Sequence, residues 1–186
     1  MKAKYWFLIA VTGMVVTACH EKKQPYNIIV KKEQVVKSDK PQAMGDYNQD
    51  YHVEWLDKKY TVKVSFKADT SLPLVSDGIK KYYDNRITLT IEREDGSQFF
   101  HREFTKHDFS AHVEGSYLSK SALVGIVYDK VEDDNLVFAA SVGSPDTSSD
   151  DYVPLVMKIS RMGAVTISRD SRLDTSAADE SADEDV

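Results

Sequence analysis

Three histidines, His101, His107 and His112, lie close together in the sequence and are the first candidates for metal chemistry. Two imidazoles reach one metal ion when they are four residues apart on a helix or two residues apart on a strand. No pair among the three has either spacing, and the only cysteine of the chain lies far away at position 19. We therefore expect no metal site and no cofactor, and interpret these histidines as surface residues.

Acidic residues gather in two stretches that could suggest calcium binding, residues 129–135 and the group of Asp146, Asp150 and Asp151. Calcium requires about six or more oxygen ligands, which a regular loop supplies from alternate positions around a central glycine. Neither stretch has that spacing or that glycine. Solvated turns between strands are the better interpretation of both.

Catalytic chemistry has little local support in the sequence. Ser116, Ser119 and Ser121 lie near His107 and His112, but no glycine-flanked turn of the kind that presents a nucleophilic serine surrounds them. Paired carboxylates for glycoside cleavage come together only in the folded chain. The sequence therefore nominates no catalytic residue, and whether the chain is an enzyme stays open, with a non-enzymatic role favoured.

Aromatic side chains are the remaining candidates for binding. The consecutive pairs Tyr82-Tyr83 and Phe99-Phe100 are unusual, because one member of each pair faces outward when the backbone is extended. Exposed aromatic rings stack on sugars or apolar ligands, and clusters of them mark interfaces. We predict a ligand-binding or partner-binding role for Trp55, Tyr82, Tyr83 and Phe99, although core packing explains aromatic residues in strands equally well.

The N-terminal residues have the layout of an export signal. Lys2 and Lys4 precede an apolar stretch at residues 5–16. Polar residues begin directly after position 19. A membrane-spanning helix needs about 20 apolar residues, so this stretch is too short to serve as one. We interpret residues 1–18 as a signal peptide that is removed.

The motif Val16-Thr17-Ala18-Cys19 resembles the bacterial lipobox, in which an aliphatic residue and two small residues precede an obligatory cysteine. This resemblance implies that the thiol of Cys19 receives a diacylglyceryl group, that cleavage occurs before it, and that palmitate-type acyl chains anchor the protein in a membrane. An ordinary signal peptide that leaves Cys19 as a free thiol is the alternative. A lone exported thiol is a liability in an oxidising compartment, which favours lipidation.

Alternation of apolar and polar residues runs through the middle of the chain and predicts β-strands with one wet face. Short gaps with turn residues, such as Asp95-Gly96, are too short for parallel crossovers. Thr105 and Asp108 resemble a capping box and predict one short helix through Ala111. The expected strands are residues 51–56, 60–66, 87–91, 98–104, 122–131, 136–142, 153–160 and 164–168.

We therefore predict an all-β fold, an antiparallel sandwich or a small up-and-down barrel of about eight strands with one short helix. Residues 122–131 and 136–142 are almost continuously apolar or small, which predicts central strands that are covered on both faces. The expected organisation is a signal peptide at residues 1–18, a flexible tether at 19–50, the β domain at 51–170 and a disordered acidic tail at 171–186.

The net charge of −6 is concentrated at the C-terminus, because residues 174–186 contain six acidic residues and no basic one. A nucleic-acid-binding protein would show a basic excess or a basic stripe, and neither is visible. We expect no nucleic-acid partner.

Residues 118–127, residues 136–151 with Ser144-Pro145, and the closing segment at 152–168 with Gly163 resemble an uncharacterised family of small lipoproteins from Bacteroidetes. The resemblance covers most of residues 45–170. It implies a small, compact β domain behind a lipid anchor, and it assigns neither an activity nor a site.

These observations predict a membrane-anchored cell-envelope lipoprotein that binds a protein partner or a small envelope ligand. A glycan or peptidoglycan hydrolase and a lipocalin-like carrier of an apolar ligand are the alternatives. In many lipoproteins an aspartate directly after the lipidated cysteine retains the protein in the inner membrane, and here this position is His20. Surface-exposed lipoproteins of Bacteroidetes resemble one another in an acidic cluster after the cysteine, whereas here Glu21 is followed by Lys22 and Lys23. The expected location is the outer membrane, facing the periplasm.

Overall fold

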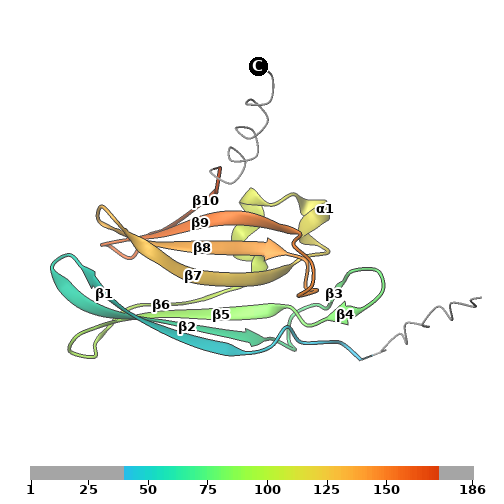
Figure 1. Ribbon diagram of the computed structural model, residues 1–186, viewed down its shortest axis with the longest axis horizontal. Helices are drawn as coiled ribbons and strands as arrows, with labels where there is room; N and C mark the ends of the chain where they lie inside the picture. Colours follow the sequence, from blue (N-terminus) through green and yellow to red (C-terminus); the bar gives the residue numbers. More distant parts are fainter. Residues whose placement is uncertain (1–39, 172–186) are drawn as a thin grey trace, which may run out of the picture. The chain divides into compact units, whose positions relative to one another are not determined.

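Residues 40–171 are described by the computed structural model of the chain, and they form two four-stranded antiparallel sheets and a two-stranded one (Figure 1). Cys19, the signal segment and the tail beyond residue 171 lie outside the described residues. The first sheet has the strand order β1 (Tyr47–Trp55), β2 (Lys58–Ala68), β5 (Asn85–Arg93), β6 (Gln98–Phe104). The second sheet has the order β10 (Val165–Arg169), β9 (Tyr152–Ser160), β8 (Asn135–Gly143), β7 (Ala122–Glu132).

The two sheets pack face to face and share one hydrophobic core. β7 lies against β2 and β5, and the rings of Tyr51 on β1 and Tyr128 on β7 meet with centroids 5.4 Å apart. The sheets form a sandwich and do not close into a barrel, so the all-β antiparallel prediction is confirmed in its sandwich form. The lipocalin-like alternative is left without the closed barrel that it requires.

Strand β2 illustrates how the sequence builds this core. Val62, Val64 and Phe66 are at most 2% exposed, while the residues between them reach the outer face. Each of the three faces an apolar partner on β5 in the antiparallel register. The largest fully buried side chains of the described residues are Trp55, Phe104, Phe109, Phe138, Ile87, Leu89, Ile91, Leu123, Ile126, Leu136, Leu155 and Met157.

Short elements connect the strands at one end of the sandwich. β3 (Val75–Ser76) and β4 (Lys81–Tyr82) form a two-stranded arm before β5, and Gln42 forms a parallel bridge to Tyr82 of this arm. The 3₁₀ helix η1 (Lys106–His112) and the one-turn helix α1 (Gly115–Leu118) lead from β6 to β7. The expected capping box is present, because the backbone N–H of Thr105 donates to the Asp108 carboxylate at 2.9 Å.

The turn between β5 and β6 differs from the two-residue turn that the sequence predicts. Asp95-Gly96 is not a two-residue turn, because Arg93 pairs with Ser97 across a three-residue loop in which Gly96 has a φ of +80°. Such loops combine a turn with a left-handed residue that glycine adopts at no steric cost. The β1–β2 turn places Leu56 and Asp57 at positive φ, 53° and 57°.

An irregularity in β6 explains the consecutive phenylalanines. Ile91 pairs with Phe100 and Glu92 pairs with Gln98, which leaves Phe99 as an extra residue on its strand. A β-bulge of this kind lets two neighbouring side chains turn toward the same face. Both Phe99 and Phe100 are half-buried and pack against the core.

The expectation that two apolar segments form central strands is correct for β8 and wrong for β7, which lies at the edge of the second sheet. Val127 of β7 is 40% exposed. The register of β7 shifts between Leu123 and Gly125 and again between Tyr128 and Lys130. Each shift changes which face the following side chains occupy, so the apolar residues follow one another without burial on both faces.

Neither helix within residues 40–171 has the length and apolar character needed to cross a bilayer.

Candidate binding sites

The four aromatic residues predicted to bind a ligand lie at opposite ends of the first sheet. Trp55 ends β1 and Phe99 lies near the start of β6, whereas Tyr82 and Tyr83 lie at the entry to β5. Trp55 and Tyr82 are 2% and 4% exposed, and Tyr83 and Phe99 are half-buried. The structure therefore brings Trp55 and Phe99 together, and it separates them from the two tyrosines.

Trp55 and Phe99 form an aromatic cluster with Tyr60 of β2. The ring centroid of Trp55 lies 5.2 Å from that of Tyr60 and 5.3 Å from that of Phe99. The guanidinium carbon of Arg93 lies over the Phe99 ring, 5.3 Å from its centroid. This cluster closes one end of the core, and its tilted and edge-on ring pairs are the arrangements that aromatic packing favours.

A depression of about 570 Å³ lies beside this cluster, between the β1–β2 and β5–β6 hairpins. We call it the hairpin depression. Tyr60 and Arg93, which contact Phe99, are also part of its lining. Val53 contributes from the buried face of β1. The other lining residues come from the outer face and the turns, and they are His52, Glu54, Lys59, Thr61, Glu92, Glu94 and Gly96.

Charges of both signs surround the hairpin depression, and ion pairs link several of them. Glu92 accepts from the Nζ of Lys63 at 2.7 Å, and this hydrogen bond raises the pKa of the Lys63 ammonium. The Nζ atom of Lys59 lies 3.9 Å from the Oε1 atom of Glu94. The Nδ1 atom of His52 lies 3.2 Å from the hydroxyl of Thr61 on the neighbouring strand. The depression is therefore polar, and it offers donors and acceptors side by side.

A second pocket, of about 310 Å³, lies at the other end of the sandwich under the β8–β9 loop. We call it the loop pocket. Its apolar part consists of Met44, Tyr47, Phe66 and Val124, and its polar part consists of Ser144, Asp146, Thr147 and Ser149. The sequence suggested Asp146 only as a calcium ligand. It gave no sign of Tyr47 or Phe66 as neighbours of Asp146, because these residues lie 80 or more positions away from it in the chain.

The polar side of the loop pocket is held by the hydrogen bonds of its own loop. The Oδ1 atom of Asp146 accepts from the N–H and the hydroxyl of Ser148 at 3.0 and 2.7 Å, and its pKa is lowered by these bonds. The backbone N–H of Ser144 donates to the backbone carbonyl of Asp151 across the base of the loop, at 2.8 Å. The Nζ of Lys80 lies 3.8 Å from Oδ2 of Asp146 and ties the loop to the β3–β4 arm.

The apolar side of the loop pocket is fixed by strand register. Tyr47 of β1 pairs with Phe66 of β2, and their rings stack with centroids 4.7 Å apart and planes 8° from parallel. Partial burial raises the pKa of the Tyr47 hydroxyl, with a smaller effect from Tyr51, so this group is a neutral donor and acceptor at ordinary pH. No hydrogen bond joins the Tyr47 hydroxyl to another described residue.

Tyr82 lies close to the loop pocket without lining it. Its hydroxyl donates to Oδ2 of Asp77 at 3.2 Å, and burial together with this carboxylate raises its pKa to about 12. Asp146 adds a smaller effect in the same direction. Tyr82 thus supports the arm that carries Lys80, and the ring of Tyr82 is buried.

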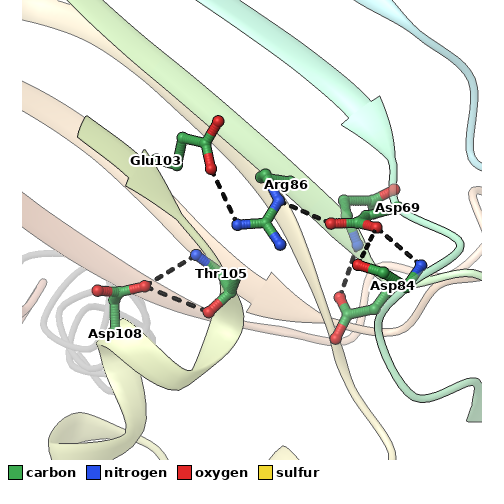
Figure 2. Close-up of polar contacts among 8 residues, drawn as sticks. Asp69, Asp84, Arg86, Glu103, Thr105 and Asp108 are labelled. Carbon is green, nitrogen blue, oxygen red and sulfur yellow. Dashed lines mark hydrogen bonds and ion pairs between the residues drawn. The ribbon is translucent and has the colours of Figure 1, made fainter. Parts of the chain in front are cut away.

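Two groups of polar contacts lie along the start of β5 (Figure 2). On the outer face, Arg86 donates to Asp69 at 2.6 Å and to Glu103 at 3.0 Å, so it joins three segments of the first sheet. On the inner side, the buried carboxylate of Asp84 accepts from the backbone N–H groups of Asn85 and Leu123 at 2.8 and 3.1 Å. These contacts hold the start of β5 against the start of β7.

The groups weighed for metal binding and nucleophilic catalysis do not converge within residues 40–171. Histidine, aspartate and glutamate side chains there form no group of three that could hold a metal ion. The hydroxyls of Ser116, Ser119 and Ser121 donate to Glu114, to the carbonyl of Ser116 and to the carbonyl of Tyr117. No hydrogen bond of the described part joins one of these serines to a histidine.

The fold and these sites define an all-β sandwich domain with polar depressions at its ends. Residues 27–167 match the family model described as a domain of unknown function, DUF4738. Because the match covers more than half of the chain, the chain belongs to this family. The match confirms the expected membership of an uncharacterised family, and it does not include Cys19. No curated protein matches the chain at a significant level.

Proposed function

We propose that the chain is a lipoprotein of the cell envelope, anchored through Cys19, whose β sandwich binds a polar protein partner at the hairpin depression. The motif Val16-Thr17-Ala18-Cys19 behind an apolar stretch supports the anchor. Each buried acyl methylene contributes about 0.8 kcal/mol, so two or more chains hold the protein on a membrane essentially permanently. The residues after Cys19 favour the outer membrane, with the sandwich in the periplasm.

The observation that carries the binding role is the hairpin depression itself. It is the larger of the two concave sites described, it lies on an exposed face, and charges of both signs and hydroxyls surround it. A partner with a complementary pattern of charges gains specificity and association rate from such a surface. Arg93 adds a guanidinium already ordered by its hydrogen bonds to Ser97 and to the carbonyl of Gln98, both at 3.1 Å.

A photo-crosslinking residue at Glu54 tests the partner site in the full, membrane-anchored chain. Glu54 is exposed and lines the depression. The matched control is the same residue at Thr166, which is exposed on the second sheet. We expect a defined adduct with one envelope protein from position 54 and none from position 166. Equal yields from both positions, or no adduct from position 54, would overturn the proposal.

The anchor is tested separately. We expect the mature protein to carry acyl chains on residue 19, measured by mass, and to partition with detergent. The Cys19→Ser variant should appear in the aqueous phase or remain as the uncleaved precursor. An unmodified residue 19 in the mature protein would remove the lipoprotein part of the proposal and leave the partner site untouched.

A glycan or peptidoglycan hydrolase is the second candidate, favoured by the three carboxylates of Glu54, Glu92 and Glu94 around the hairpin depression. Glycoside cleavage uses two carboxyl groups on either side of the scissile bond. The full chain would then release reducing ends from an envelope glycan, and Glu54→Gln or Glu92→Gln would abolish this release. Activity that survives both substitutions would place the chemistry elsewhere.

A further inference from the structure

We infer that the loop pocket is a binding site for a single neutral sugar ring, whether free or at the end of a glycan. This site lies at the opposite end of the sandwich from the hairpin depression and does not depend on the partner proposed there. The two sides of the pocket, the compensated charge of Asp146 and the size of the pocket all suit such a ligand.

The apolar side suits the C–H face of a pyranose. The half-buried ring of Tyr47 offers this surface, with Phe66, which is only 2% exposed, stacked beneath it. Met44 and Val124 extend the apolar surface beside Tyr47. The C–H groups of a sugar ring pack on aromatic side chains, which offer large, rigid surfaces with a negative face. The register of β1 with β2 fixes the stacked pair before any ligand arrives, so little ordering is needed on binding.

The polar side suits the hydroxyl groups of the same ring. Ser144, Thr147 and Ser149 contribute hydroxyls, and Asp146 contributes a carboxylate. A sugar hydroxyl that donates to a carboxylate makes a charge-assisted hydrogen bond, which is about twice as strong as a neutral one. The hydroxyl of Tyr47 has no hydrogen-bond partner among the described residues and is neutral, so it can donate to or accept from a ligand.

The charge in the pocket favours a neutral ligand over a cationic one. Aromatic rings beside a carboxylate could also bind an organic cation. Here, however, the ammonium of Lys80 already lies 3.8 Å from Oδ2 of Asp146. A cationic ligand would meet the repulsion of Lys80, whereas a neutral ligand can add a hydrogen bond to the carboxylate without displacing it.

The size of the pocket sets the length of the ligand. Its volume of about 310 Å³ lies at the lower end of the range typical of small-molecule sites, about 300–1,000 Å³. One ring fills such a space, and a longer glycan would extend into solvent. We therefore expect weak binding of single sugars, with dissociation constants in about the millimolar range.

Ligand-observed NMR with the full chain, in a detergent that has no sugar headgroup, tests the inference. The probes are the methyl glycosides of glucose, galactose, mannose and N-acetylglucosamine, with choline as the cationic comparison. We expect saturation transfer to at least one glycoside, strongest at the C–H groups of one ring face, and none to choline. Transfer to choline but not to a sugar, or to no probe, would overturn the inference.

Substitutions then assign the binding to this pocket. Tyr47→Phe keeps the stacked ring and removes the hydroxyl, and it should weaken sugar binding about three- to tenfold. Asp146→Asn keeps the acceptor for Ser148 and removes the charge, and it should weaken binding about tenfold or more. The matched controls are Tyr51→Phe, on the same strand, and Asp150→Asn, in the same loop, because neither residue lines the pocket.

The controls should bind sugar as the unaltered chain does, and thermal unfolding should show that all four variants are folded. If Tyr47→Phe and Asp146→Asn leave sugar binding unchanged, the site is not the loop pocket and the inference fails. Loss of sugar binding on changing Glu54 of the hairpin depression, with the loop pocket variants unaffected, would also overturn it. Neither result would bear on the partner site, which is read from crosslinking.

Discussion

The Nζ atom of Lys106 lies 3.1 Å from Oδ2 of Asp84, and the two side chains are 7% and 2% exposed. Nζ also donates to the carbonyl of Ser121 at 2.7 Å. The pair therefore joins the 3₁₀ helix η1 to the segment before β5 and to the segment before β7. A buried ion pair of this kind is costly to desolvate, and it holds only because both charges have further hydrogen bonds.

Removing one member of this pair should destabilise the fold strongly. Lys106→Met leaves the buried carboxylate of Asp84 without its cation, and we expect a loss of about 3–5 kcal/mol in the free energy of unfolding. The double variant Asp84→Asn, Lys106→Met should recover part of this loss, because no unpaired charge remains. The control is Lys63→Met, which breaks an exposed pair and should change the free energy of unfolding much less. Urea unfolding that gives the same small loss for Lys106→Met and Lys63→Met would contradict this account.

The stability of the first sheet should depend on pH through Asp69. Hydrogen bonds from Ser71, and then from Arg86, lower the pKa of Asp69 from 3.8 to about 2. A lowered pKa means that the folded state favours the charged carboxylate, so its contribution is complete above a pH of about 4 and is lost as the pH falls toward about 2. We expect the melting temperature of Asp69→Asn to fall less over this window than that of the unaltered chain. Parallel melting curves for the two proteins across the window would count against this role.

The β1–β2 turn should be improved by changing Leu56. Leu56 has a φ of 53°, a left-handed conformation that costs a bulky residue about 1–2 kcal/mol. Asparagine adopts it more readily and is common at this position of two-residue hairpin turns. Leu56→Asn should therefore raise the free energy of unfolding by about 0.5–1 kcal/mol. Leu74→Asn is the control, since Leu74 is also exposed but has no positive φ, and it should give no gain.

The end of β8, where the β8–β9 loop begins, should tolerate no side chain at Gly143. A Cβ atom there would lie 2.5 Å from the carbonyl oxygen of Asp151 and 2.5 Å from the Cβ atom of Tyr152. Because backbone must move to relieve this contact, Gly143→Ala should cost about 1–3 kcal/mol and weaken sugar binding in the loop pocket. Gly125→Ala is the matched control, because its nearest neighbours would be 3.7 Å or more away. Similar unfolding midpoints for the two variants would show that the loop adapts freely.

Strand positions and the fold class could be predicted from the sequence, because alternation is a local property of the chain. The runs around Val64 and Leu89 alternate with polar residues and form the centre of the first sheet. The Thr105–Asp108 cap was equally visible, since both of its partners lie within four residues. The extra residue Phe99 and the register shifts of β7 could not be predicted from the sequence, because a bulge depends on the pairing with the partner strand.

The sites could be predicted only in part. Two of the four chosen aromatic residues, Trp55 and Tyr82, are buried, since aromatic residues in strands fill cores as readily as they bind ligands. The loop pocket joins Tyr47 to residues about 100 positions later, and only the packing of one sheet on the other brings them together. In the sequence, the charged residues around Glu54 are typical of any solvated strand face. Their concave arrangement depends on how the two hairpins lie in the folded sheet.

The bridge between Gln42 and Tyr82 determines where the described chain enters the sandwich. It enters beside the β3–β4 arm, which lies at the far end of β2 and β5 from the turns at Leu56 and Gly96. Nine residues of strand separate the two ends, a length of about 30 Å. A partner that recognises the hairpin turns therefore need not approach the end of the sandwich at which residue 40 enters.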